Sequence, residues 1–195
     1  FTNRHMAHQP GDQRRAAHEQ ATLGRTYATT LRSWVGGNVP KKLYDSTVDE
    51  FTADAFIQSL YNRRRVVVVE TTTDGDVFGI AFDGPFTPQN ERLSDPSAFL
   101  FTFESHGRCT TPQRFVACEM ARFGLSVALY HQHTCGFLCV WVNGGGEMYF
   151  GGEHSESFCS DLDQVFEQIG VKTLTGKNGF YRFHRAKRLV AFSFE

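Results

Sequence analysis

The stretch VVVVETTTDGDVFGI, residues 66–80, decides the fold of this chain. Four consecutive valines are typical of a strand covered on both faces, because β-branched side chains favour extended backbone. Asp74-Gly75 then separates the valines from a second apolar run, Val77 to Ile80. An Asp-Gly pair between two such runs predicts an antiparallel hairpin with a tight turn, in which both turn residues take positive φ.

Further short apolar runs follow the hairpin at close intervals. In one of them, period-two alternation places Phe99, Phe101 and Phe103 on one face. The run of glycines after Asn143 supplies a bend between two later runs. The expected strands are residues 98–103, 115–118, 125–130, 137–142, 148–150 and 189–194.

Two helices are expected beside these strands. Thr52 can cap the first helix, which then turns Phe56, Ile57 and Leu60 toward a core. The second is expected over residues 161–169, where apolar residues recur at helical spacing. Many short strands with few helices predict a mainly β fold, a two-sheet antiparallel β-sandwich.

Composition favours a packed domain and excludes several classes of protein. Hydrophobic residues make up 41% of the 195 residues, which is ample for a core. The formal net charge of -1 gives no overall attraction to nucleic acid. No apolar stretch approaches the ~20 residues of a membrane-spanning helix. Five cysteines, an odd number without framework spacing, indicate a reducing compartment. We therefore expect a cytoplasmic protein, either free or peripheral to a membrane or cytoskeletal assembly.

The first 40 residues differ from the rest of the chain. Few apolar residues recur there at helical spacing, and Gly36-Gly37 and Pro40 punctuate the end of the segment. We interpret residues 1–40 as a loosely held lead-in helix or a linker. Residues 41–195 are then the folded domain.

One short segment carries residues that suit metal or redox chemistry. His131, His133 and Cys135 would share a face of an extended strand, and imidazole with thiolate is a zinc-binding combination. Against this, structural zinc sites usually draw their ligands from paired knuckles, and a reactive thiol needs exposure and a lowered pKa. We expect surface imidazoles and buried thiols there, with a metal or redox site as the alternative.

No other pattern indicates a catalytic centre. The glycine-containing stretches lack the spacing of a phosphate-binding loop, and no serine has glycine on both flanks as in a nucleophile elbow. The carboxylates are scattered, without the spacing of an acid–base pair. No catalytic residue and no cofactor are therefore expected.

From Lys41 onward, the order of motifs resembles the TLDc family. Leu43 to Ser46, followed by Asp49 to Thr52, is similar to the opening of the family, and Asp74 to Gly79 resembles its hairpin signature. At residues 131–135 the chain departs from the family's glycine-rich start of a strand. A Cys-x-Thr-Phe element of the family is also missing around Phe158, which indicates a divergent member. The other similar segments are residues 82–86, 94–101, 137–141, 152–158 and 189–192.

The resemblance implies a two-sheet β-sandwich with flanking helices and no agreed catalytic mechanism. It also implies a link to oxidative-stress protection and binding to the peripheral sector of the vacuolar proton pump (V-ATPase). We therefore expect a non-catalytic protein-interaction domain. The alternatives are a structural component of a larger cytoskeletal or membrane-associated assembly, and a thiol- or metal-dependent antioxidant enzyme.

Two loops are long for hairpins and form the expected partner-binding surface, because binding residues concentrate on loops. These loops are residues 83–95 and 144–157. The candidate contact residues on them are Phe86, Glu91, Arg92, Glu147, Tyr149, Glu153 and His154.

Overall fold

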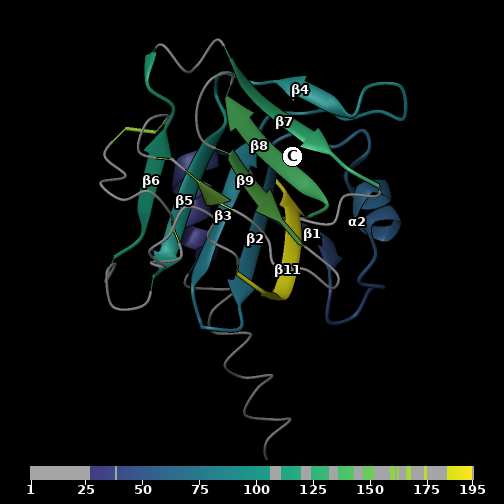
Figure 1. Cartoon of the computed structure of the whole chain (residues 1–195), viewed down its shortest axis with the longest axis horizontal. Coiled ribbons are helices and arrows are strands. Elements are labelled where there is room, and N and C mark those ends of the chain that lie inside the picture. Colours follow the sequence, from purple (N-terminus) through teal and green to yellow (C-terminus); the bar gives the residue numbers. More distant parts are fainter. Residues whose placement is uncertain are drawn as a thin grey trace, which may run out of the picture.

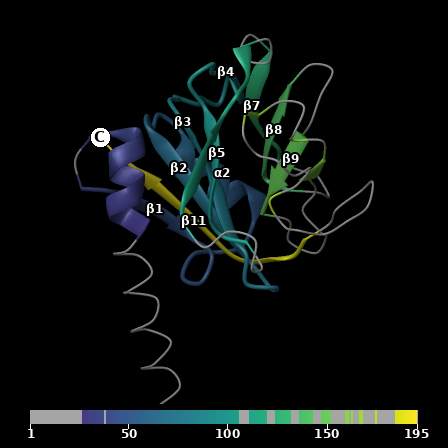
Figure 2. The ribbon, with the colours of Figure 1, turned by 90° about the vertical axis from the view of Figure 1, so that its left-hand side faces the viewer.

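The computed structural model describes residues 27–37, 39–105, 111–119, 124–131, 136–142, 147–151, 159–160, 162, 166–167, 174 and 184–194. These residues form a mainly β structure of two antiparallel sheets with flanking helices, which confirms the predicted fold class. Figures 1 and 2 show the sheets face to face, with β7, β8 and β9 opposite β11, β2 and β3.

The larger sheet has six strands and the smaller has five. In spatial order, the larger sheet consists of β1 (Lys41–Asp45), β11 (Ala186–Ser193), β2 (Val66–Thr72), β3 (Val77–Phe82), β5 (Phe99–Glu104) and β6 (Gln113–Val116). The smaller sheet consists of β10 (Cys159–Ser160), β9 (Glu147–Phe150), β8 (Leu138–Val142), β7 (Leu125–Leu129) and β4 (Arg92–Ser94). Every strand expected from the apolar runs is present, with ends shifted by a few residues.

The β2–β3 hairpin forms as predicted, but its turn does not. The valines of β2 pair in register with β3, so that Val68 lies opposite Ile80. Of the two expected turn residues, only Gly75 has positive φ, at 94°. The Thr72 side chain accepts a hydrogen bond from the backbone N–H of Asp76 at 3.0 Å, and the Thr72 N–H donates to the Asp76 carbonyl at 2.9 Å. The Thr72–Asp76 pair therefore encloses three residues, 73–75. The prediction that both Asp74 and Gly75 take positive φ is wrong.

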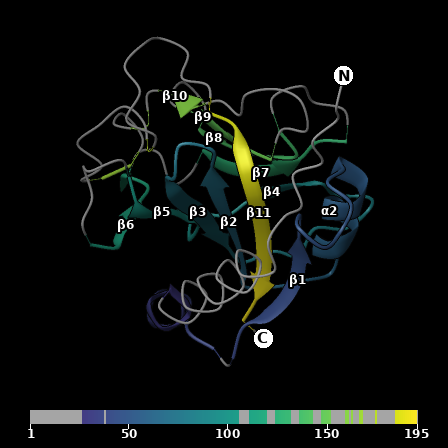
Figure 3. The ribbon, with the colours of Figure 1, turned by 90° about the horizontal axis from the view of Figure 1, so that it is seen from below.

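The main core lies between the two sheets. Alternate residues of β2 and β3, such as Val68 and Ile80, face Val127 and Val140 of the smaller sheet, and all four are buried. Helix α2 (Ala53–Leu60) closes one side of the sandwich (Figures 1 and 3).

The start of helix α2 follows the sequence prediction. The Thr52 side chain accepts a hydrogen bond from the backbone N–H of Ala55 at 3.3 Å, as an N-cap should. Phe56, Ile57 and Leu60 are buried in the main core, which confirms the predicted core face of this helix.

A second apolar cluster lies on the other face of the six-stranded sheet. Phe99, Phe101 and Phe103 face it together, as alternation predicts, and a helix of residues 27–35 covers them. Trp34 of this helix stacks on Phe103 at 5.8 Å between ring centroids. Figure 2 shows the helix, in purple, outside the sandwich. Part of the segment predicted to be a lead-in therefore packs on the sheet.

A buried polar contact joins the two sheets. Glu70 of β2 and His184 are both fully buried, with 2.9 Å between Oε1 and Nε2, although the pair is not aligned for a hydrogen bond. The other carboxylate oxygen of Glu70 accepts a hydrogen bond from the Gly151 N–H, just after β9, at 2.8 Å. Glu70 thus fixes the end of β9 against the larger sheet.

The helix expected at residues 161–169 falls mostly outside the described residues. Leu162 and Phe166 are described, and both side chains are buried in the main core. Among the described residues, no helix combines the length and apolar character that crossing a bilayer requires.

Candidate partner-binding surface

The outer face of the five-stranded sheet follows from its register. Leu93, Val127, Val140 and Met148 point into the main core. Because side chains alternate along a strand, the neighbours of these residues point outward. Pairing then aligns one outward row across the sheet: Arg92, Ala128, Cys139 and Tyr149.

Four side chains dominate this outward side, and we call them the aromatic face: Arg92, Tyr130, Trp141 and Tyr149. The Arg92 guanidinium carbon lies 4.4 Å from the centroid of the Trp141 ring, a cation–π distance. The Tyr130 and Tyr149 rings are 6.3 Å apart. Arg92 is exposed and the three aromatic residues are half-buried. Trp, Tyr and Arg are the residue types enriched at the energetic centres of protein interfaces.

A charged cluster, which we call the histidine bridge, borders the aromatic face. His131 contacts Asp54 of α2 at 2.6 Å through Nδ1 and Glu91 at 2.7 Å through Nε2. The Tyr61 hydroxyl donates a hydrogen bond to the same Glu91 carboxylate. Glu91 and His131 adjoin Arg92 and Tyr130 in sequence, so the two features neighbour each other along the backbone at the ends of β4 and β7.

The contacts within the histidine bridge favour the charged forms of His131 and Glu91. Hydrogen bonds to Asp54 and Glu91 raise the pKa of His131. The hydrogen bonds from Tyr61 and His131 lower the pKa of Glu91. The hydrogen bond to Glu91 raises the pKa of Tyr61 to about 12, so this phenol keeps its proton at neutral pH. When His131 is protonated, it holds α2 and the start of β4 together at the end of β7.

The 83–95 loop is held firmly at both ends. Asp95 accepts hydrogen bonds from the Asp83 N–H at 2.6 Å and from the Ser97 N–H at 2.9 Å. Between these ends, Phe86 is fully buried, and its ring packs 5.3 Å from that of Phe82. The Phe86 side chain therefore belongs to the core, and a partner cannot touch it. Its apolar character, not a binding role, explains its position.

The other residues expected to contact a partner lie in different parts of the structure, and some of them are not described. Glu91, Arg92 and Tyr149 lie on the surface built from the aromatic face and the histidine bridge. Glu147 begins β9 opposite Trp141, and only its backbone is described. Glu153 and His154 lie outside the described residues.

The expected metal or redox site is only partly visible. His133 and Cys135 lie outside the described residues, whereas His131 is engaged with Asp54 and Glu91. Among the residues that the structure describes, no three His, Cys, Asp or Glu side chains are placed to hold a metal ion. Of the cysteines whose side chains the structure describes, Cys139 is buried and Cys118 is half-buried, and neither forms a disulfide.

Sequence reasoning missed Asp54, Tyr61, Tyr130 and Trp141 as surface residues. Trp141 lies in an apolar strand, which favours a core position, yet it occupies an outward position. The sequence carries one signal for Tyr130 and Trp141: each lies an odd number of positions from core residues of the same strand run, which places it on the opposite face. The link between Asp54 and His131 spans 77 positions, and no local pattern encodes it.

One comparison with known proteins identifies the kind of domain. A family model, the TLDc domain, matches residues 22–174, which is most of the chain. This range includes the helix of residues 27–35 and all strands of the five-stranded sheet. No curated protein matches the chain.

Proposed function

Because the chain belongs to the TLDc family, we propose that it is a non-catalytic protein-interaction domain that binds the peripheral sector of V-ATPase. The observation that carries the proposal is the aromatic face. Arg92 stacked on Trp141, beside two half-buried tyrosines, offers large contact area with little conformational entropy to lose. This composition suits a protein partner.

The histidine bridge supports the same proposal. A surface that binds a protein gains affinity when its side chains are already held in place before association. The contacts of His131 with Asp54 and Glu91 fix the border of the aromatic face in this way. The bridge also places carboxylates beside Arg92, which gives the surface charges of both signs.

We further propose that any protective effect against oxidants depends on the partner and not on the Cys139 thiol. The support comes from the burial of this cysteine. Cys139 is 1% exposed, and a buried thiol is a poor nucleophile toward solvent oxidants. Replacing Cys139 by Ser should then leave protection unchanged in cells, whereas Arg92→Ala should reduce it.

Two arginine variants test the proposed surface under matched conditions. Arg92→Ala removes a cation–π contact from the five-stranded sheet, and Arg114→Ala removes one from Phe99 of the six-stranded sheet, at 4.0 Å. The tagged 195-residue chain is used to capture proteins from cytosol, and peripheral V-ATPase subunits are quantified by mass spectrometry. We expect capture by the wild type and by Arg114→Ala, and about ten-fold weaker binding by Arg92→Ala.

Other results would contradict specific parts of the proposal. Equal capture by all three proteins would exclude the aromatic face as the binding surface. Specific capture of cytoskeletal or scaffold components in place of pump subunits would overturn the choice of partner and favour a structural role. Absence of any reproducible partner would overturn the assignment as an interaction domain.

A further inference from the structure

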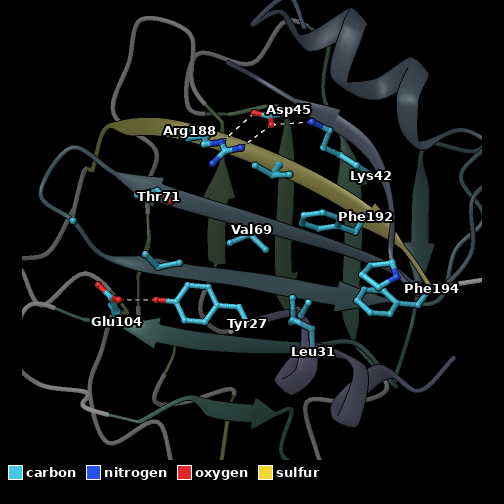
Figure 4. A pocket seen from close by; sticks show the side chains of 15 residues that line it. Tyr27, Leu31, Lys42, Asp45, Val69, Thr71, Glu104, Arg188, Phe192 and Phe194 are labelled. Carbon is cyan, nitrogen blue, oxygen red and sulfur yellow. Dashed lines mark hydrogen bonds and ion pairs between the residues drawn. The ribbon is translucent and has the colours of Figure 1, made fainter. Parts of the chain in front are cut away.

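The helix of residues 27–35 covers only part of the outer face of the six-stranded sheet. Between this helix and β1 there is a groove of about 380 Å³. Its floor consists of Val69 on β2 together with Val190 and Phe192 on β11. Figure 4 shows these strands between Tyr27 and Leu31 on one side and Lys42 on the other. The volume lies within the roughly 300–1,000 Å³ typical of small-molecule sites.

The apolar floor departs from what the sequence predicts for β2. Four consecutive valines indicate a strand covered on both faces, and Val66, Val67 and Val68 are indeed fully buried. Val69 is only half-buried, as is Phe192 on the neighbouring strand. Binding of an apolar ligand to such a sheet face is favourable, because it removes apolar side chains from water.

A β-bulge places charge on one wall of the groove. Lys42 and Asp45 are three residues apart, so a regular strand would turn them to opposite faces. The register shift between Lys42 and Tyr44 instead pairs Lys42 with Phe192 and Asp45 with Val190, both of which line the groove. The bulge thus brings both charged side chains to the rim.

Two cations share a single carboxylate at this rim. Arg188 donates to Asp45 through Nε at 3.0 Å and through Nη2 at 2.7 Å. Lys42 Nζ lies 3.2 Å from the same carboxylate, and its side chain is 52% exposed. Burial alone would raise the pKa of Asp45, but hydrogen bonds from Arg188 and Thr47 outweigh burial and lower it. The wall therefore carries one net positive charge.

The opposite wall has the opposite sign. The Tyr27 hydroxyl donates a hydrogen bond to Glu104 at 2.6 Å, so a carboxylate borders the groove on the side of the helix. An anionic group on a ligand is attracted by the Lys42 wall and repelled by the Glu104 wall. The groove thus selects both the charge of a ligand and the side on which that charge lies.

We propose that this groove binds a long-chain carboxylate. Its hydrocarbon chain lies over Val69, Val190 and Phe192, parallel to β2 and β11. Its carboxylate lies at Lys42, whose ammonium group carries three donors and uses one on Asp45 among the described residues. A single anionic group matches the single net positive charge of the wall.

Titration of the 195-residue chain with dodecanoate, below its micelle concentration, tests the proposal by calorimetry. We expect saturable binding of dodecanoate and weaker binding of dodecanol, which has the same chain length without the charge. Lys42→Ala should weaken dodecanoate binding about five-fold and leave dodecanol unchanged. The matched control is Lys41→Ala, because Lys41 is the next residue of β1, pairs with Ser193 and does not line the groove.

A second variant locates the ligand independently of charge. Val69→Trp fills the floor of the groove and should abolish binding of both ligands, with circular dichroism confirming that the variant is folded. Unchanged affinity in Val69→Trp or in Lys42→Ala would overturn the proposed site. Equal affinity for dodecanol and dodecanoate would overturn recognition of the carboxylate. Absence of dodecanoate binding, as expected if a peptide segment occupies the groove, would overturn the proposal as a whole.

Discussion

Substitution of Glu70 by Ala should lower the free energy of unfolding strongly. The carboxylate is fully buried, contacts His184 at 2.9 Å and accepts a hydrogen bond from Gly151 at 2.8 Å. Removing it leaves two buried polar groups without this partner, and each such group costs about 1–3 kcal/mol. Because the Glu70–His184 contact is poorly aligned, we expect a total in the lower half of that sum, about 3 kcal/mol.

This loss is large against a typical free energy of unfolding of about 5–15 kcal/mol. For a domain of this size it corresponds to a fall in Tm of about 6–12 °C. Urea denaturation followed by circular dichroism measures the free energy of unfolding directly. The control is Glu104→Ala, which removes an exposed hydrogen bond to Tyr27 and should cost less than about 1 kcal/mol. If Glu70→Ala cost no more than this control, the reasoning about the buried contact would be refuted.

Two further predictions concern a close contact and a titrating group. Gly79→Ala should destabilise the protein by about 2–3 kcal/mol in the same denaturation assay. The reason is that the added Cβ would lie 2.1 Å from the Val68 carbonyl oxygen and 2.4 Å from the Phe101 ring. An unchanged midpoint would contradict this expectation, because it would show that β3 shifts freely to make room. The two carboxylates beside His131 raise its pKa, so its contribution is complete below the ordinary value of 6.5 and is lost as pH rises through the raised value. The difference in free energy of unfolding between wild type and His131→Gln should therefore be larger at about pH 5.5 than at about pH 8.5. A difference that grew with rising pH would contradict this prediction.

The elements that local patterns encode were predictable from the sequence. The valine run, the Thr52 cap and the alternation of Phe99, Phe101 and Phe103 each depend on residues close together in the chain. Their physical causes are β-branched sterics, capping of free N–H groups and the two-residue period of strands. These causes act within one element, so a single sequence reveals them.

The features that build the surfaces were not predictable in this way. The contact of His131 with Asp54 depends on how β7 is placed against α2, which no local pattern fixes. The outward position of Trp141 follows from its register with Ser126, and a one-residue slip would turn it inward. The rim of the groove depends on a bulge in β1, where one extra residue reverses the face of every later side chain.

The aromatic face is the proposed surface for binding the partner. Hydroxyl-radical footprinting of the chain, alone and with purified peripheral V-ATPase sector, measures it residue by residue, because Trp and Tyr are oxidised readily when they are accessible. The chain has two tryptophans, and both are half-buried: Trp141 on the aromatic face and Trp34 on the opposite side of the sandwich. We expect the pump sector to protect Trp141 and Tyr149 and to leave Trp34 unchanged. Protection of Trp34 with no change at Trp141 would contradict it.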